Sequence, residues 1–148
     1  MPTRATLTSQ SPEQTLEIAA SLARQFPHAL VLLHGELGAG KTLFARGFAK
    51  GLNIECNVSS PSYTLMNEYK SGNQSLYHID LYRINCFEEV IDIGLFDILN
   101  AGCPCLIEWA ERVTELNKLP HLEVCITRSA DDPDWQRQIA WELKESQI

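Results

Sequence analysis

The sequence contains no long apolar run, although 45% of its 148 residues are hydrophobic. A membrane-spanning helix needs about 20 consecutive apolar residues, so the composition argues against an integral membrane protein. Residues 1–4 lead into polar positions instead of the apolar core of a signal peptide. We therefore expect a cytoplasmic protein, and the length fits a single domain over residues 1–148.

Basic charge is scarce as well. Lysine and arginine number 12 against 19 aspartates and glutamates, which gives a net charge of −7 and a pI near 5.0. Proteins that hold a nucleic-acid backbone use a surplus of basic side chains to displace counterions from the phosphates. The lack of such a surplus argues against unaided binding to nucleic acid, although it does not exclude a local basic patch.

The cysteines are odd in number and show no C-x-x-C spacing. Without a secretory context, such a set favours reduced thiols over disulfides. Cys103 and Cys105 form one close pair around Pro104. We interpret them as small apolar side chains that lead into a buried strand, in preference to a metal or redox site. The five cysteines are Cys56, Cys86, Cys103, Cys105 and Cys125.

One stretch carries a specific chemical pattern, G-x-x-x-x-G-K-[ST], directly after the apolar residues 29–33. In a P-loop, the glycines let successive backbone N–H groups approach the phosphates of a nucleotide. Lys41 then reaches the β and γ phosphates, and the hydroxyl of Thr42 binds Mg²⁺. The alternative is an ordinary glycine-rich turn between a strand and a helix. The stretch comprises Gly35, Glu36, Leu37, Gly38, Ala39, Gly40, Lys41 and Thr42.

Periodicity predicts the elements on either side of this stretch. Residues 11–26 read as a helix that begins with a capping box at Ser11. Residues 29–33 are apolar on both faces, as in a central strand of a parallel sheet. Residues 43–51 read as a short helix that ends at Gly51 and directs its N-terminus at bound phosphate.

The second half of the chain alternates strand-like and helix-like runs. We expect a hairpin of strands 63–69 and 76–82, a helix over 85–100, a strand over 105–109, a short helix over 110–116, and a final hairpin of strands 122–127 and 138–143. The order of these elements predicts an α/β P-loop NTPase domain. Its β-sheet should be mixed but mainly parallel, flanked by helices, and extended by antiparallel hairpins.

Two carboxylates on strand-like runs are candidates for chemistry at the nucleotide. A P-loop enzyme takes the acids near Mg²⁺ and the attacking water from the C-terminal ends of neighbouring strands. Glu108 ends the apolar run 105–107, and Asp80 lies on a run whose alternation places His78 on the same face. The alternative for each acid is a solvated carboxylate at a strand end. His78 either positions Asp80 or a water, or is purely structural.

Three further features have two readings each. Arg83 raises the question of an arginine finger, whose loss typically costs roughly 10³–10⁵ in rate. If no arginine reaches the γ-phosphate, we expect slow hydrolysis that depends on a partner. Trp109 is either a core aromatic, which strand alternation favours, or a ring beside the nucleotide. The hydroxyls of Ser60, Ser62 and Thr64 form either a switch segment that senses the γ-phosphate or a plain turn.

Taken in order along the chain, these motifs resemble those of the bacterial TsaE (YjeE) ATPase family. The resemblance covers nearly the whole chain, from the first predicted helix to the final hairpin. Ser62 departs from the threonine that is usual in the family, but the hydroxyl is retained. The motifs are the P-loop, the segment 60–64, the run 67–69, H-x-D-L-Y-R at 78–83 and I-E-W at 107–109.

The resemblance implies a role in making threonylcarbamoyladenosine beside the tRNA anticodon. Family members bind ATP or ADP with Mg²⁺ and act on the TsaD–TsaB heterodimer, so they meet tRNA only indirectly. There, TsaD transfers the threonylcarbamoyl group that TsaC makes, and ATP hydrolysis is thought to support repeated turnover.

The family roles carry over to matching positions of this sequence. The resemblance implies phosphate binding by Lys41 and Mg²⁺ binding by Thr42 and Glu108. It also implies that Asp80 holds Mg²⁺ or the attacking water. Lys41, Asp80 and Glu108 are then the expected catalytic side chains, and Trp109 is a candidate for the nucleotide pocket or the partner surface.

Two other functions are compatible with these residues. A small-molecule P-loop kinase would transfer the γ-phosphate to an acceptor, although the sequence has no clear arginine-rich lid segment. A nucleotide-dependent binding module would use ATP only to select a conformation. The guanine-reading N-K-x-D motif is absent, and ATP is favoured over other nucleotides mainly by the resemblance.

Overall fold

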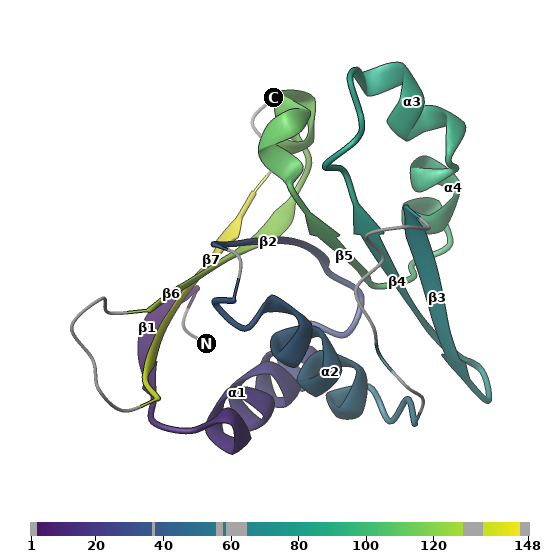
Figure 1. Ribbon diagram of the computed structural model, residues 1–148. Helices are drawn as coiled ribbons and strands as arrows, with labels where there is room; N and C mark the ends of the chain where they lie inside the picture. The colour runs from purple at the N-terminus through teal and green to yellow at the C-terminus, as the bar shows by residue number, and fades with distance from the viewer. Residues whose placement is uncertain (1–2, 37, 56–57, 59–64, 129–134, 146–148) are drawn as a thin grey trace.

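Seven strands form one mixed sheet in the order β1-β7-β6-β2-β5-β4-β3 (Figure 1). The computed structural model describes residues 3–36, 38–55, 58, 65–128 and 135–145. The strands are β1 (Arg4–Ser9), β2 (Leu30–Gly35), β3 (Met66–Ser71), β4 (Gln74–Asp80), β5 (Cys105–Glu108), β6 (His121–Arg128) and β7 (Arg137–Lys144).

The parallel part of the sheet lies at its centre. Strands β6, β2, β5 and β4 run parallel to one another. Strands β1 and β7 at one edge and β3 at the other add antiparallel pairs. The predicted mixed α/β sheet and both predicted hairpins are confirmed.

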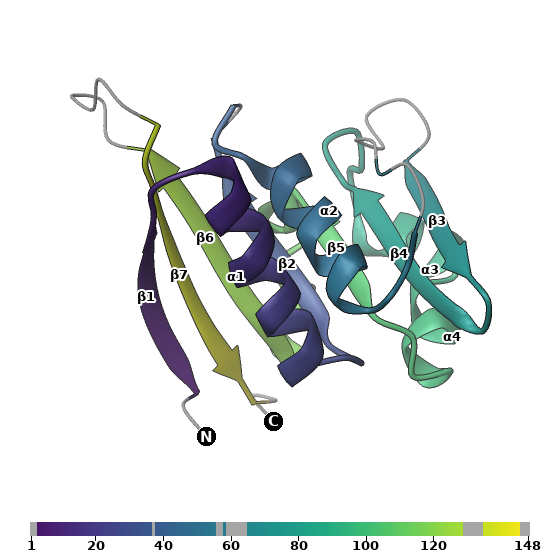
Figure 2. The ribbon, with the colours of Figure 1, turned by 90° about the horizontal axis from the view of Figure 1, so that it is seen from below.

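Helices cover the two faces of the sheet. On one face, α1 (Pro12–Gln25) and α2 (Lys41–Gly51) lie side by side (Figure 2). The other face of β2, β5 and β4 packs against α3 (Phe87–Asp92), α4 (Leu95–Asn100) and the 3₁₀ helices η1 (Ala110–Arg112) and η2 (Thr114–Lys118). Among the residues described, no helix has the length and apolarity that crossing a membrane requires.

Strand β2 is buried on both faces, as its apolar sequence predicts. Val31 and Leu33 belong to the apolar cluster under α1 and α2, whereas Leu30 and Leu32 belong to the cluster on the opposite face. All four side chains are at most 5% exposed. The segment that follows β2 is therefore anchored in the middle of the core.

The start of α1 is confirmed. The Ser11 Oγ accepts a hydrogen bond from the Gln14 backbone N–H at 3.1 Å. The Gln14 side chain reaches back in turn, but it accepts from the Gln10 N–H at 2.6 Å instead of from the cap residue itself. Two N–H groups at the helix start are thus satisfied reciprocally.

Helix α2 ends at Gly51 as predicted, but Gly51 does not supply the left-handed turn that follows the helix. It is still helical, and the turn that ends α2 places Asn53 in the left-handed region with φ 63°. The Ile54 N–H then bonds to the Ala49 carbonyl at 2.9 Å, which completes a Schellman-type end. Gly51 instead lies against the α1 backbone at Ala20, where a Cβ would collide.

Gly47 is the clearest test of this close helix contact. A Cβ built there would lie 2.5 Å from the Leu16 carbonyl oxygen in α1. We expect Gly47→Ala to lower the free energy of unfolding by about 1–2 kcal/mol, because overpacking against backbone atoms costs roughly 2–3 kcal/mol and outweighs the roughly 1 kcal/mol gained in helix propensity. Urea unfolding would measure the change, with exposed Arg46→Ala as the control. Unchanged stability for Gly47→Ala would contradict the close packing.

Several predicted boundaries were wrong. The helix expected over 85–100 begins at Phe87 and divides at Gly94, whose φ of 91° supplies a left-handed turn between α3 and α4. The helix expected over 110–116 is two short 3₁₀ helices. Strand β1 was not predicted at all, because most of its side chains are exposed and it lies at the edge of the sheet, paired with β7.

Candidate functional site

The segment 35–42, which we call the glycine loop, joins β2 to α2. Gly38 and Gly40 have φ angles of 82° and 112°, which a side chain would disfavour. The Ala39 N–H bonds to the Glu36 carbonyl at 2.9 Å and closes the turn. Lys41 and Thr42 are the first two residues of α2, so the loop ends where helix N–H groups point outward. Leu37 lies outside the described residues.

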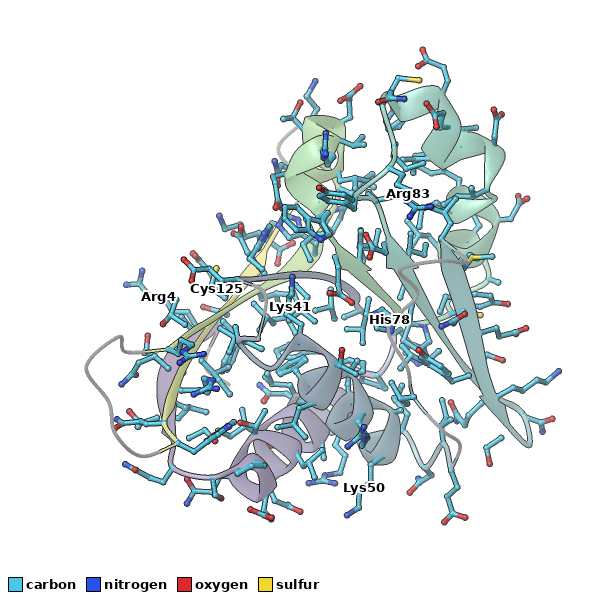
Figure 3. All side chains as sticks on the ribbon, in the orientation of Figure 1. Arg4, Lys41, Lys50, His78, Arg83 and Cys125 are labelled. Carbon is cyan, nitrogen blue, oxygen red and sulfur yellow. The ribbon has the colours of Figure 1, made fainter. Side chains whose placement is uncertain are left out.

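Lys41 and Glu108 meet above the end of the parallel strands. The Lys41 Nζ lies 3.6 Å from the Glu108 Oε1, and the Lys41 side chain is only 11% exposed. The other Glu108 oxygen, Oε2, lies 2.6 Å from the His78 Nε2. Lys41 comes from α2 and His78 from β4 (Figure 3), so three elements converge on one carboxylate.

Glu108 is held as a buried, ionised acid. It is 4% exposed, which excludes the alternative of a solvated strand end. Burial alone would raise its pKa, but the hydrogen bond from His78 and the positive charge of Lys41 together hold the pKa below its ordinary value. The carboxylate can therefore accept hydrogen bonds or bind a cation at neutral pH.

Asp80 lies beside Glu108 in the sheet. The two residues are register partners on the parallel strands β4 and β5, and Asp80 is 9% exposed. Its Oδ1 accepts a hydrogen bond from the Tyr82 N–H at 2.8 Å, which fixes the carboxylate at the strand end. The hydrogen bond of the His78 Nε2 goes to Glu108, and not to Asp80 as one of the alternatives for His78 had it.

The oxygen atoms gathered here suit Mg²⁺. A hard cation of this kind is usually held by one or two carboxylates together with substrate phosphates. Asp80 and Glu108 supply two carboxylates at the ends of neighbouring strands, and Thr42 supplies a hydroxyl in the first turn of α2. Within the described ranges, no group of three or more His, Cys, Asp or Glu side chains is arranged to bind a metal without a nucleotide. The donors thus fit a metal that arrives with phosphates.

Of the two interpretations of Trp109, the strand alternation that favoured a core position does not hold. Strand β5 ends at Glu108, and Trp109 adopts a left-handed backbone with φ 61° and ψ 35°, so strand alternation no longer applies to it. Its ring lies 5.2 Å from the Lys41 Nζ, within cation–π range. The ring also meets Tyr82 edge-on at 5.0 Å. Trp109 therefore belongs to the surroundings of Lys41.

The arginine that contacts the glycine loop is Arg137, which sequence patterns did not single out. From β7, its Nε donates to the Ala39 carbonyl at 2.9 Å, and a second nitrogen lies 3.4 Å from the Gly38 carbonyl. Its guanidinium also stacks 4.4 Å above the Trp135 ring. Arg83 is exposed after β4 and lies apart from Lys41 in Figure 3.

A cavity of about 500 Å³ opens beside the glycine loop. This volume is within the range of small-molecule sites, roughly 300–1,000 Å³. The cavity reaches from the loop to the C-terminal end of β6. Its lining includes four residues predicted to bind a cofactor, Gly35, Glu36, Ala39 and Trp109, together with Thr127 and Arg128.

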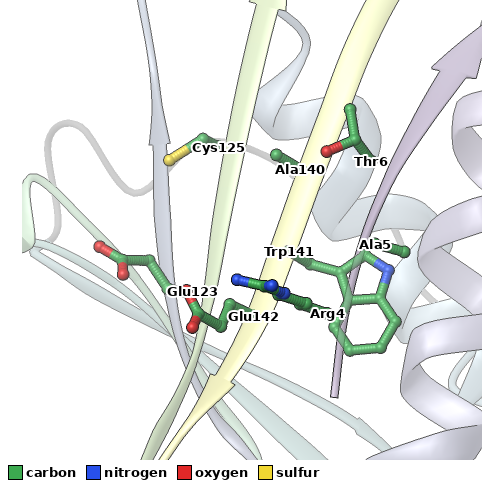
Figure 4. A pocket seen from close by; sticks show the side chains of 8 residues that line it. All are labelled: Arg4, Ala5, Thr6, Glu123, Cys125, Ala140, Trp141 and Glu142. Carbon is green, nitrogen blue, oxygen red and sulfur yellow. The ribbon is translucent and has the colours of Figure 1, made fainter. Parts of the chain in front are cut away.

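A second cavity of about 490 Å³ lies over β1, β7 and β6 (Figure 4). Arg4 and Glu142 contribute charge to it, as does Glu123, which forms an ion pair with Lys144 at 2.6 Å. Its lining contains no residue of the glycine loop, whereas the lining of the first cavity includes Gly35, Glu36 and Ala39. The cavity beside the glycine loop is therefore the better candidate site.

Two other predictions concern side chains away from this centre. Cys86, Cys103, Cys105 and Cys125 are free thiols, as expected, whereas Cys56 lies outside the described residues. Burial raises the pKa of the Cys105 thiol well above its usual range, which fits a small apolar filler in β5. Ser60, Ser62 and Thr64, predicted as a switch segment or plain turn, also lie outside the described residues.

Comparisons with known proteins agree with this arrangement. The sequence profile of the family "Threonylcarbamoyl adenosine biosynthesis protein TsaE" matches residues 9–139. The tRNA threonylcarbamoyladenosine biosynthesis protein TsaE of Bacillus subtilis is 41% identical over 125 residues, which are 82% of this chain and 77% of that protein. The protein of the same name from Rickettsia typhi is 40% identical over 121 residues, 79% of this chain and 82% of its own length.

The fold leads to the same relatives. A crystal structure of Bacillus subtilis YdiB superimposes with a TM-score of 0.76 and 34% sequence identity, covering 97% of this chain and 87% of that one. At this identity and coverage, the likeness extends beyond a shared fold class. The profile match and the relatives together show that this chain belongs to the TsaE family.

Proposed function

We infer that this protein binds ATP with Mg²⁺ at the glycine loop and hydrolyses it slowly in support of tRNA threonylcarbamoyladenosine biosynthesis. The observation that carries the inference is the convergence of Lys41 and Glu108, 3.6 Å apart, at the end of a loop of P-loop sequence. A cation for phosphate and an acid for the metal or water are thus brought to one helix N-terminus.

Each group at the site has a separate role in this proposal. Backbone N–H groups of Gly38 and Gly40 and the N-terminus of α2 hold the phosphates, and Mg²⁺ neutralises part of their charge. Lys41 leaves its ion pair with Glu108 and binds the β and γ phosphates instead. Glu108 Oε1 is then released toward the metal or the attacking water, and Asp80 occupies the neighbouring position.

The positions of the arginines predict a slow rate of ATP hydrolysis. Arg83 is exposed and apart from Lys41, and Arg137 already donates to carbonyls of the loop. Neither of these two arginines is placed as an arginine finger for the γ-phosphate, and Arg128 at the cavity beside the glycine loop is exposed. Since such a group typically contributes roughly 10³–10⁵ in rate, hydrolysis by the isolated protein should be weak.

The names of the relatives and the resemblance described above support the pathway and the partner. We propose that the protein acts on the TsaD–TsaB complex and meets tRNA through it. The net charge of −7 agrees with this division, because the partners would supply the basic surface that holds tRNA.

Reconstitution of the modification tests this function. Threonylcarbamoyladenosine formation over several turnovers would be measured with TsaD, TsaB, TsaC, tRNA and ATP, with this protein added or withheld. Phosphate release would be followed in parallel, with and without TsaD–TsaB. We expect slow release by the protein alone, faster release in the complex, and more product per TsaD when the protein is present.

The outcomes separate the alternatives. Nucleotide binding with no phosphate release under either condition would point to a binding module, in which ATP only selects a conformation. Transfer of the γ-phosphate to a metabolite would point to a kinase. Product formation that is indifferent to the protein would contradict its place in this pathway.

A further inference from the structure

A buried hydrogen-bond chain leads into Glu108 from the side away from the glycine loop. His78 is 0% exposed, and Tyr69 on the neighbouring strand β3 is 5% exposed. The Tyr69 hydroxyl lies 3.0 Å from the His78 Nδ1, and the His78 Nε2 lies 2.6 Å from the Glu108 Oε2. Three side chains from three adjacent strands therefore form one continuous polar path.

The chemistry of the groups assigns a direction to this path. An ionised Glu108 can only accept, so the His78 Nε2 must carry the hydrogen between them. When the ring carries its hydrogen on Nε2 alone, Nδ1 is an acceptor and the Tyr69 hydroxyl donates to it. The Asn67 Nδ2 lies 3.5 Å from the Tyr69 oxygen and donates to it.

The path fixes one oxygen of Glu108 and leaves the other exposed to the glycine loop. His78 holds Oε2, and Lys41 is the partner of Oε1. The backbone is fixed as well, since the Leu81 N–H donates to the Glu108 carbonyl at 3.0 Å. When Lys41 moves to a phosphate, the orientation of the Glu108 carboxylate is already fixed, and Oε1 points in a defined direction.

We propose that Tyr69 and His78 are positioning residues that orient Glu108 for ATP hydrolysis. The proposal rests on the function proposed above, but it concerns residues that do not touch the nucleotide. Groups that orient a metal or catalytic ligand from behind typically contribute roughly tenfold to hundredfold in activity. They contribute little to nucleotide affinity, because the phosphates contact the loop and Lys41 instead.

Substitutions that remove or retain each hydrogen bond test the proposal. We expect His78→Leu to lower kcat for ATP hydrolysis roughly tenfold to hundredfold, while the dissociation constant for ATP changes less than about twofold. His78→Gln keeps an N–H that can donate to Glu108, so it should retain most of the wild-type kcat. Tyr69→Phe should lower kcat roughly threefold to tenfold.

Tyr77→Phe is the matched control for Tyr69→Phe. The Tyr77 hydroxyl donates to Glu68 at 3.0 Å on the surface, and its loss should leave kcat unchanged. Because Tyr69→Phe keeps the buried ring, it remains informative even if His78→Leu fails to fold. Unfolding free energies of all variants show whether any loss of rate is merely a loss of folded protein.

A spectroscopic measurement tests the direction of the chain without any turnover. In ¹⁵N NMR spectra of the nucleotide-free protein, His78 should show a protonated Nε2 and a bare, hydrogen-bonded Nδ1, whose signal shifts in Tyr69→Phe. The opposite tautomer would overturn the assigned direction.

The failure of this proposal is distinct from the failure of the proposed function. Absent hydrolysis by the wild type, alone and with TsaD–TsaB, would refute the function. A wild type that hydrolyses ATP, with Tyr69→Phe and folded His78 variants equally fast, would refute the positioning role and leave His78 structural.

Discussion

Replacing Lys41 with methionine should weaken ATP binding roughly a hundredfold and reduce hydrolysis at least as much. Removing one partner of a desolvated charge pair typically costs about 2–5 kcal/mol, and 3 kcal/mol corresponds to roughly a hundredfold. The Lys41 side chain is only 11% exposed, so its charge acts in a medium that screens it weakly. Methionine keeps a flexible apolar chain against Trp109, so the fold should persist. Titration with a fluorescent ATP analogue and a phosphate-release assay measure the two losses.

Lys50→Met is the matched control, since it removes the same charge from the exposed last turn of the same helix. It should change affinity less than about twofold, because a solvated charge at a distance is screened by salt. Undiminished ATP binding by Lys41→Met would contradict a phosphate site at the glycine loop. Loss of binding in both variants would instead indicate a general effect of charge.

Much of the fold followed from local patterns in the sequence. Residues 29–33 are apolar on both faces, and this alone predicts a central strand, which β2 is. The Ser11 cap predicts the start of α1, and the turn 71–73 predicts the antiparallel hairpin of β3 and β4. In each case the signal lies within a few residues of the feature that it predicts.

The features that were missed depend on contacts between distant segments. Gly51 was predicted as the end of α2, but its close approach to the α1 backbone was not predicted. Strand β1 forms because it pairs with β7, and its own side chains show little apolar alternation. Trp109 leaves strand geometry only because β5 ends at Glu108. None of these can be read from periodicity.

In the candidate site, too, local motifs were predicted and contacts between distant segments were missed. Lys41, Asp80 and Glu108 were predicted from motifs, and the structure brings them to one end of the parallel strands. The partners that hold them in place were not predicted. Arg137 reaches the loop from β7, and His78 contacts Glu108 because β4 and β5 are adjacent and parallel. Such partners depend on strand register, which the motifs do not encode.

Replacing Glu108 with glutamine should have the largest effect on hydrolysis and an opposite effect on binding. An acid that holds the metal or takes a proton from water contributes roughly 10²–10⁴ in rate, so kcat should fall by that factor. Glutamine keeps the size of the side chain, and its carbonyl oxygen can still accept from His78. Removing the negative charge also frees Lys41 from its ion pair, so ATP without Mg²⁺ should bind more tightly than to the wild type. Phosphate release and titrations with and without EDTA measure both changes.

Glu111→Gln provides the control, because it removes an equal charge from an exposed carboxylate beside the glycine-loop cavity, where the side chain is 56% exposed. Its hydrolysis should stay close to wild type. A folded Glu108→Gln variant that hydrolyses ATP within about threefold of wild type would show that Glu108 is a structural partner of His78 and Lys41. Slower hydrolysis with unchanged Mg²⁺-free affinity would show instead that Lys41 is available to phosphate without leaving Glu108. Only the combination of lost turnover and tighter metal-free binding fits a lysine that must exchange its carboxylate for the nucleotide.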